Sequence, residues 1–396
     1  MTRVLLAGGG HTHLIAGPLL AARAAGQVRV MLLAPEPHLL YSGMMPGWIA
    51  GQYAFDECSI DLARVAAAAG IEWVQGTLVD VDFGAREVVG ADGRRHSYDL
   101  LSLNVGSENL RGDLTSDVRA CVLGAKPFAD FVAGWRRWLA RAPRAPYCLV
   151  AGGGPAGVEI ACALAALCST GGALEGGRVE LAAAGHRVLP GHSAIAAGLA
   201  ARSLRDRGVG LRLRTRHLGA DRDGVLLAED GPAGTALRID ADLVIVATGA
   251  RPPAWLGRAA RAHGLTVAHD GGLAVRGDLR AVCDDRVFAS GDCAGFVDRR
   301  VPKAGVHALR QGPALAASIA RRLAELEPAT PALVLAGPAE YQPQRLALAL
   351  LNRCDGTAIG SWGPFAAAGA PLWHWKDRID RGFVDRFRSP AAPAAV

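Results

Sequence analysis

The sequence lacks several features that would assign its class at once. No apolar run reaches the roughly 18 residues that a membrane-spanning helix needs. The N-terminus has no charged segment followed by an apolar one, as a secretory signal would have. Despite a net charge of +6, no block of lysine and arginine resembles a nucleic-acid-binding arm. We therefore expect a cytoplasmic protein that spans no membrane and binds no nucleic acid.

The eight cysteines do not form the short paired motifs of reactive or metal-binding cysteines. Neither a C-x-x-C nor a C-x4-C spacing occurs, which argues against a local redox pair and against a zinc site. A cytoplasmic setting also disfavours structural disulfides. We therefore expect no bound metal, and we expect most of the cysteines to be small core residues.

Glycine, in contrast, is abundant, with 50 residues in a composition that is 51% hydrophobic and typical of a globular protein. One cluster, Gly8-Gly9-Gly10, directly follows an apolar strand predicted over residues 4–7. A helix over residues 13–23 and a strand over residues 28–33 come next. This β-α-β order predicts a parallel sheet. It also predicts that backbone N–H groups and a helix N-terminus face a pyrophosphate at the glycines.

The same pattern recurs about 144 residues later. A strand over residues 147–151 leads into Gly152-Gly153-Gly154-Pro155-Ala156-Gly157, and a helix over residues 158–167 follows. Each unit also closes with a strand that ends near a glycine, at Gly106 in the first and at Thr248-Gly249 in the second. A single glycine loop is weak evidence. Two in register predict two Rossmann-like dinucleotide-binding domains in an α/β protein.

The first loop departs from the G-x-G-x-x-G pattern, and both units lack the acid that usually follows the second strand. His13 stands at the third position of the first loop, where Gly157 stands in the second. The acid that would bind a ribose hydroxyl is replaced by Ala34, and we expect Glu36, two residues later, to hold the ribose. In the second unit Arg187 favours the 2′-phosphate of NADPH, although a solvated surface charge explains it equally well.

With both loops, Ala247-Thr248-Gly249 and Ser290-Gly291-Asp292 in place, the sequence resembles the pyridine nucleotide-disulfide oxidoreductase superfamily over nearly its whole length. The resemblance implies FAD in the first unit and NADH or NADPH in the second. It also implies three structural parts. These are an FAD-binding domain of residues 1–110 and 275–330, an NAD(P)-binding domain of residues 111–274, and a small α+β appendage of residues 331–396. In the appendage we expect strands at 345–351 and 357–362 and a helix at 373–387, after a linker at 325–338.

Three segments, residues 41–47, 303–313 and 375–381, narrow the resemblance. Together they look like the flavoprotein often found fused ahead of selenide, water dikinase. Its better understood relatives are type II NADH dehydrogenases and sulfide:quinone oxidoreductases. Residues 39–51, where disulfide reductases carry their redox cysteines, contain none, so dithiol chemistry of that kind is not expected.

The resemblance also implies roles for single residues. Asp292 would contact the flavin ribityl chain. Lys303, in a motif similar to that of sulfide:quinone oxidoreductases, would lie near the flavin and steady its negative charge, together with a helix expected from about residue 307. Glu159 would lie near the nicotinamide, unless it is only a first-turn acid favoured by the helix dipole. His11 would face the flavin ring, unless backbone groups satisfy it.

The expected cofactor-binding residues are Gly8, Gly9, Gly10, His11, Thr12, His13, Glu36, Ser42, Gly106, Gly152, Gly154, Pro155, Gly157, Glu159, Arg187, Thr248, Gly249, Gly291, Asp292, Lys303, Ala304 and Gly305. Three of them, Lys303, Glu159 and His11, are also the expected catalytic residues.

The electron acceptor is expected to be a small molecule, and a quinone is the favoured candidate. The glutamine pair of type II dehydrogenases is not reproduced, because Val306 and Arg310 stand at those positions. Apolar residues every four positions, at Trp375, Ile379, Phe383 and Phe387, predict an amphipathic helix. That helix could contact a membrane surface, the protein's own flavin domain or a second subunit of a homodimer.

Two other functions stay open at this point. Cys354 lies loosely where a sulfide-handling cysteine can fall, which would suit an oxidoreductase of sulfur or selenium compounds. The chain could also be a flavin-containing partner module of a selenium-handling enzyme, with FAD bound but no turnover.

Overall fold

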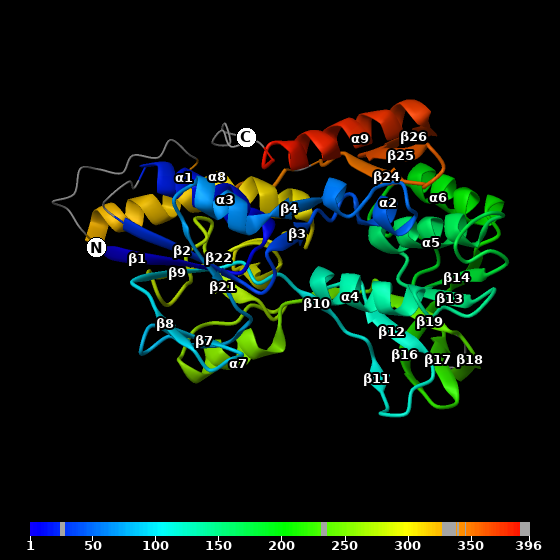
Figure 1. Ribbon diagram of the computed structural model, residues 1–396, viewed down its shortest axis with the longest axis horizontal. Helices are drawn as coiled ribbons and strands as arrows, with labels where there is room; N and C mark the ends of the chain where they lie inside the picture. Colours follow the sequence, from blue (N-terminus) through cyan, green and yellow to red (C-terminus); the bar gives the residue numbers. More distant parts are fainter. Residues whose placement is uncertain (24–27, 231–235, 327–337, 339, 345, 389–396) are drawn as a thin grey trace.

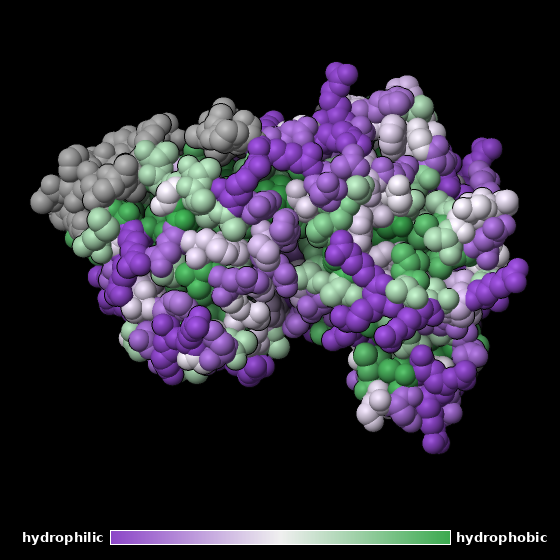
Figure 2. Space-filling view, viewed as in Figure 1, coloured by the Kyte–Doolittle hydropathy of each residue, from purple (hydrophilic) through white to green (hydrophobic). Residues whose placement is uncertain are grey.

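A computed structural model gives the structure of residues 1–23, 28–230, 236–326, 338, 340–344 and 346–388. The chain forms two α/β halves side by side, with a small third part above both (Figure 1). In the space-filling view the surface is notched between the two halves along the lower edge (Figure 2). None of the described helices is long and apolar enough to cross a membrane.

The first half is built on a five-stranded parallel sheet. Its order is β22 (Val287–Ala289), β9 (Leu100–Leu103), β1 (Thr2–Ala7), β2 (Val28–Ala34) and β5 (Glu72–Gln75). Helices α1 (His11–Arg23) and α8 (Gly305–Leu326) pack side by side on the sheet. Apolar residues of β1 and β9 are almost fully buried, as expected for strands covered on both faces.

The second half repeats this order. Its parallel sheet runs β12 (Cys121–Gly124), β19 (Leu243–Val246), β13 (Tyr147–Ala151), β14 (Arg178–Ala183) and β15 (Gly210–Leu213). Its helices are α4 (Phe128–Leu139), α5 (Pro155–Cys168) and α6 (Ala194–Asp206). In both halves the closing strand lies between the outermost strand and the first one. The predicted fold, two Rossmann-like α/β halves, is confirmed.

Smaller elements decorate the two sheets. In the first half they include β3 (His38–Leu40), α2 (Met45–Ile49), η1 (Asp56–Cys58), β4 (Ser59–Asp61), α3 (Leu62–Ala68), β6 (Leu78–Asp82), β7 (Glu87–Gly90), β8 (Arg95–Ser97), α7 (Ala254–Ala262), β21 (Leu273–Val275), η2 (Gly291–Cys293) and β23 (Ala294–Phe296). A four-stranded sheet of the second half contains β11 (Asp113–Leu114), β16 (Thr215–Asp221), β17 (Gly224–Glu229) and β18 (Ala236–Ile239).

The chain crosses between the halves twice. The two crossings, β10 (Glu108–Asn109) and β20 (Ala250–Arg251), pair with each other as antiparallel strands. Because β22 then joins the first sheet, residues far apart in sequence form one half. The carboxyl ends of β1, β9 and β22 meet at the same edge of that sheet, where a ligand site is expected.

The third part consists of β24 (Ala349–Asn352), β25 (Ala358–Trp362), β26 (Phe365–Gly369) and α9 (Ala370–Asp385). The strand expected at 345–351 therefore begins four residues later, and β26 was not foreseen. Residues 327–337 and 339 of the expected linker, and residue 345, lie outside the described residues. The hairpin packs on α5 and α6, and α9 lies over both halves (Figure 1).

The predicted apolar face of α9 is divided between two environments. Phe383 and Phe387 are 8% and 5% exposed and belong to the core cluster that includes Leu14 of α1. Trp375 and Ile379 remain 49% and 46% exposed. Of the alternatives that the sequence leaves open for this face, contact with the protein itself is therefore the one made by Phe383 and by Phe387, just beyond the end of the helix. Contact of Trp375 and Ile379 with a membrane or a second subunit stays a prediction.

Candidate functional site

The two glycine loops begin with the same turn. The Gly8 N–H donates to the Leu33 carbonyl at 2.7 Å, and the Gly152 N–H donates to the Ala182 carbonyl at 2.8 Å. Both glycines have positive φ, 101° and 132°. A Cβ at Gly8 would lie 2.4 Å from the carbonyl oxygen of Asn104, so only glycine lets this turn close against the neighbouring strand.

Space is left open where the second loop meets its helix. Helix α5 begins at Pro155 with Gly154 as its N-cap, and a Cβ at Gly154 would meet nothing within 4 Å. At Gly157 a Cβ would lie 1.8 Å from the Gly152 carbonyl, so this glycine is needed for close packing of helix on strand. Open space before a helix N-terminus fits the pyrophosphate of a dinucleotide.

In the first loop, the side chain of His13 points into the protein interior. Its ring is 1% exposed, with Nδ1 2.7 Å from the Gly8 carbonyl and Nε2 2.8 Å from the Ser102 hydroxyl. Thr12 is likewise used within the protein, because its N–H donates to Asn104 Oδ1 and its hydroxyl donates to the Ala308 carbonyl. The expected cofactor contacts of these two side chains are therefore replaced by structural ones. A glycine at this position would let helix and strand pack closely, whereas the His13 ring fills the space between them.

The substitution His13→Ala should destabilise the protein by roughly 3 kcal/mol at pH 7, because a buried carbonyl and hydroxyl lose their partner. Burial lowers the pKa of His13 to about 4 although the Gly8 carbonyl opposes this shift. The unfolded chain binds this proton near pH 6.5, so the stabilisation is lost as pH falls from 6.5 towards 4. Urea unfolding at pH 7 and pH 4.5 measures both effects. His38→Ala, at an exposed site, is the control. An equally stable His13→Ala variant would contradict this role.

His11 differs from His13 in having an orphan atom. It is 8% exposed, and its Nε2 is buried without a hydrogen-bond partner among the described residues. Burial lowers its pKa to about 4, with Asp292 raising and Lys126 lowering it to smaller extents, so the ring is neutral at pH 7. The ring packs 5.8 Å from Tyr41 and 6.5 Å from Phe383. A neutral, unsatisfied nitrogen beside the first loop fits the edge of a bound cofactor.

Asp292 lies on η2, next to the end of β22. Its Oδ2 accepts from the Ser107 hydroxyl at 2.7 Å and lies 2.5 Å from the Lys126 ammonium. Burial opposes ionisation, but Lys126 and the hydrogen bonds outweigh it and hold the pKa of Asp292 below its usual value. The carboxylate therefore stays ionised and can accept hydrogen bonds from a polyol chain.

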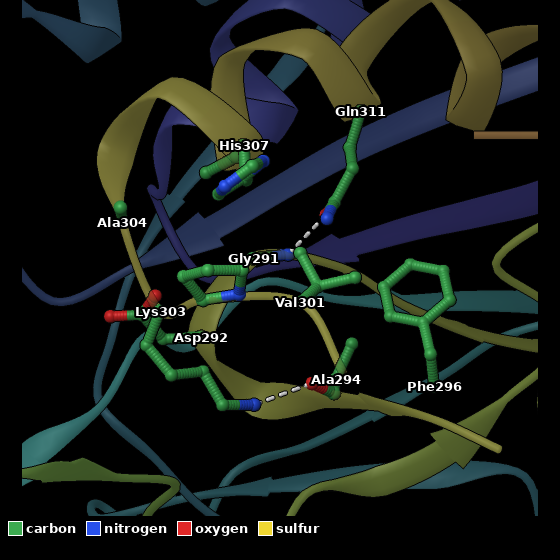
Figure 3. Close-up of a pocket in the computed structure, with 11 residues that line it drawn as sticks. Gly291, Asp292, Ala294, Phe296, Val301, Lys303, Ala304, His307 and Gln311 are labelled. Carbon is green, nitrogen blue, oxygen red and sulfur yellow. Dashed lines mark hydrogen bonds between the residues drawn. The ribbon is translucent and has the colours of Figure 1, made fainter. Parts of the chain in front are cut away.

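Lys303 lines a small cavity of about 10 Å³ together with Asp292, His307 and Gln311 (Figure 3). Its ammonium donates to the Ala294 carbonyl at 2.6 Å and lies 2.8 Å from Asp270. It lies beside Asp292 but is paired with the protein, so the charge that it would offer a flavin is partly neutralised.

Other expected residues surround the same edge. Ser42 lies beside the start of α8, since a Cβ on Gly305 would be 3.2 Å from its hydroxyl. Gly106, at φ 70°, and the exposed Thr248 and Gly249 follow the two closing strands. Glu36 is exposed just after β2, where it stays a predicted ribose ligand.

Arg187 is turned back on its own loop. Its guanidinium donates to the His192 carbonyl at 3.0 Å. His192 in turn contacts the Ser361 hydroxyl of β25 at 3.0 Å, which connects this loop to the appendage. The preference of Arg187 for NADPH stays a prediction.

Glu159 lies on the face of α5 that meets the appendage. One oxygen accepts from the Asn352 N–H at 2.7 Å. Burial raises the pKa of Glu159 to about 7, although Lys376 and the Asn352 N–H act in the opposite direction. Near neutral pH this carboxyl is therefore poised to take up or release a proton.

Lys376 and Asp380 of α9 extend this cluster. The Lys376 ammonium donates to Asp380 Oδ2 and to the Gly43 carbonyl, each at 2.6 Å. Tyr41 hydrogen-bonds to Asp380, and its ring lies 4.7 Å from Phe383. Burial raises the pKa of Asp380 above its usual value despite Lys376. The Lys376 ammonium thus interacts electrostatically with two carboxyl groups, those of Asp380 and Glu159, in a largely buried site between the halves.

Cys354 is buried beside the same cluster. Its thiol donates to the Pro46 carbonyl at 3.7 Å, and burial raises its pKa well above the usual value. A thiol of this kind is a poor nucleophile. Seven of the eight cysteines are buried or half-buried, and Cys283 is exposed.

The sequence profile of the pyridine nucleotide-disulphide oxidoreductases matches residues 2–312, which is more than half of the chain. The chain belongs to this family. Its predicted class is thereby confirmed: it is an enzyme, an FAD-dependent oxidoreductase of NADH or NADPH. The likeness to the flavoprotein fused to selenide, water dikinase stays a prediction.

Solved structures share the fold of this family member at low identity. A sulfide:quinone oxidoreductase from Aquifex aeolicus has a TM-score of 0.76 at 14% identity, over 100% of this chain and 93% of the other. NDH2 from Plasmodium falciparum, in complex with NADH, also scores 0.76, at 11% identity and 97% of each chain. A NAD-dependent persulfide reductase from A. fulgidus scores 0.71 at 20% identity, over 91% of this chain and 64% of the other. No curated protein matches the chain.

The structure thus adds Lys126, Lys376, Asp380 and Tyr41 to the candidate site. The sequence placed residues 375–381 and 41–47 in recognisable segments but could not show that they meet. One signal was present: the chain has only three lysines, at positions 126, 303 and 376, and all three lie here.

Proposed function

We propose that this enzyme passes electrons from NADH or NADPH through FAD to a quinone-type acceptor, with Glu159 supplying a proton and Lys376 a fixed positive charge at the acceptor. The observation that carries the proposal is the cluster of Glu159, Lys376 and Asp380 between α5 and α9. It combines a carboxyl whose pKa is about 7 with an ammonium in a partly dry site.

Different residues at the edges of the two sheets would bind different parts of the two cofactors. Gly9, Gly10 and His11 would face the FAD pyrophosphate and ring, and Asp292 the ribityl hydroxyls. Gly154 and the start of α5 would face the NAD(P)H pyrophosphate. When bound, FAD supplies the redox chemistry by accepting a hydride from NAD(P)H and passing electrons on.

Reduction of a quinone by two electrons takes up two protons. One of them comes with the hydride of NAD(P)H, and Glu159 offers a donor for the other. Glu159 can give up a proton near neutral pH, whereas Lys376 stays charged because Glu159 and Asp380 outweigh the effect of burial on its pKa. A fixed positive charge also favours negative charge on an acceptor oxygen. This arrangement favours acceptors with carbonyl oxygens.

Steady-state oxidation of NADH and NADPH with soluble quinones, sulfide and polysulfide as alternative substrates tests the choice of acceptor. We expect turnover with a quinone and no dependence on sulfide. Cys354→Ala should retain full activity, because its thiol is buried and hydrogen-bonded. If the variant loses turnover with sulfur or selenium donors, the sulfur-handling alternative replaces this proposal. Bound FAD without any turnover would favour a partner module.

We further propose that the appendage brings the enzyme to a membrane surface, where quinones dissolve. Large apolar side chains are exposed on α9 and on the β25–β26 hairpin, namely Trp362, Phe365, Trp375 and Ile379. Exposed aromatic residues beside basic ones suit the interface of an anionic bilayer.

The double substitution Trp375→Ala/Ile379→Ser should weaken binding to anionic lipid vesicles, measured by co-sedimentation, about tenfold or more. The reason is that each of the two side chains would bury apolar area in the bilayer. Reduction by NAD(P)H in solution should not change. Leu218→Ala, at an exposed apolar residue of the other face, is the control. If the double variant binds vesicles as well as the wild type does, Trp375 and Ile379 do not contact the membrane. A contact with another protein, such as a second subunit of a dimer, would then explain their exposure.

A further inference from the structure

Lysine is scarce in this chain, and its three residues share one arrangement. The sequence has 43 lysines and arginines, of which only Lys126, Lys303 and Lys376 are lysines. Each is ion-paired to an aspartate, and the side chains are 25%, 16% and 8% exposed. Arginine carries the positive charge everywhere else. Side-chain ammonium groups therefore occur only around the candidate site.

Lys126 lies where the two crossings between the halves meet. Its N–H donates to Asn109 Oδ1 at 2.7 Å, and its carbonyl accepts from the Asn109 N–H at 3.2 Å. The Asn109 amide also donates to the carbonyl of Thr248. Asn109 belongs to the first crossing, and Thr248 lies two residues before the second. The backbone of Lys126 is thus fixed to both connections.

The side chain of Lys126 reaches from the second half into the first. Its ammonium lies 2.5 Å from Asp292 Oδ2, the oxygen that also accepts from the Ser107 hydroxyl. In the described part of the chain, Asp292 Oδ1 has no hydrogen-bond partner. Lys126 and Ser107 therefore occupy one oxygen and leave the other for a ligand.

We propose that Lys126 is a positioning residue of the flavin site, which holds Asp292 for the ribityl chain and links the flavin-binding half to the NAD(P)-binding half. The proposal rests on the proposed function, since it places FAD at Asp292. Retention of FAD and the closed arrangement of the halves then depend on the same ion pair. Neither the glycine loops nor Asp292 alone provides this coupling.

Removal of the ammonium has a specific electrostatic consequence. The charged or titratable groups that face Asp292 are Lys126, Lys303 and His11, and Ser107 is its hydroxyl donor. His11 is neutral near pH 7, and Lys303 is already paired with Asp270. Without Lys126, Asp292 is left half-buried with less positive charge, so it is protonated at a higher pH.

The experiment uses the purified holoenzyme and four variants: Lys126→Met, Asp292→Asn, the double variant, and Arg216→Met. Arg216 forms an exposed ion pair with Asp230 and serves as the control. Release of FAD is followed by flavin fluorescence on dilution, from pH 8 to pH 4. For Lys126→Met we expect release to increase roughly ten- to a hundredfold and the midpoint of acid release to shift upward. In the Asp292→Asn background the same substitution should add less than about twofold.

Two results would overturn the proposal. Lys126→Met with wild-type FAD release and an unchanged acid midpoint would show that the ion pair positions nothing. Independent, multiplying effects of Lys126→Met and Asp292→Asn would show that Lys126 does not act through Asp292. Thermal unfolding of the apoproteins separates misfolding from weaker binding, and Lys126→Arg, which keeps the charge, should keep the wild-type acid midpoint. If the wild-type protein binds no FAD at all, the proposed function fails instead.

Discussion

The substitution Gly154→Ala should lower kcat/KM for NADH and NADPH about a hundredfold and leave the bound flavin and the fold unchanged. The backbone at Gly154, φ −76° and ψ 179°, suits alanine, and the new methyl group would meet no protein atom within 4 Å. It would instead occupy the space before α5 that we assign to the pyrophosphate. Loss of two charge-assisted hydrogen bonds accounts for an effect of this size.

Gly198→Ala is the matched control, because Gly198 lies exposed on α6 and its new methyl group would also meet nothing. Stopped-flow reduction of the flavin by each nucleotide measures the effect, and the flavin spectrum and thermal unfolding verify the fold. Unchanged reduction of Gly154→Ala would show that the second loop is not the NAD(P)H site.

The substitution Glu159→Gln should slow reoxidation by quinone roughly a hundredfold, the range of a lost proton donor. Burial raises the pKa of Glu159 to about 7, so its acid form prevails below that pH. The wild-type rate with quinone should therefore fall as pH rises through 7. The variant should show a low rate without this decline, because glutamine does not titrate.

Separate measurement of the two half-reactions decides where Glu159 acts. Reduction of the flavin by NAD(P)H should change less than about threefold in Glu159→Gln, because the side chain faces Asn352 and the appendage. Glu175→Gln, at an exposed residue of the same half, should behave as the wild type in both half-reactions. If Glu159→Gln slows reduction of the flavin by NAD(P)H and leaves reoxidation normal, Glu159 acts at the nicotinamide, as its sequence motif predicts.

Local patterns made most of the fold predictable. Apolar strands ending at glycine clusters define β1 and β13, because a tight turn against a neighbouring strand admits only glycine. The antiparallel strands β16, β17 and β18 were missed, since their apolar and polar residues do not alternate regularly. The start of β24 was misplaced by four residues, as edge positions carry little periodic signal.

The site was predictable only where it follows the chain. The loops and Asp292 have motifs of their own, whereas the contact of Lys126 with Asp292 joins residues 166 positions apart. His13 shows the opposite failure. Its position in a phosphate loop suggested a ligand contact, but the His13 ring is buried in the first half, where it hydrogen-bonds to Ser102 of β9. Such choices depend on packing between distant strands, which a local pattern does not contain.

Anaerobic titration of the purified protein with NADH and NADPH tests the central claim most directly. The oxidised protein should show a flavin spectrum that bleaches with one equivalent of at least one nucleotide, and added quinone should restore it. A protein that carries no flavin, or a flavin that neither nucleotide bleaches, would contradict the account.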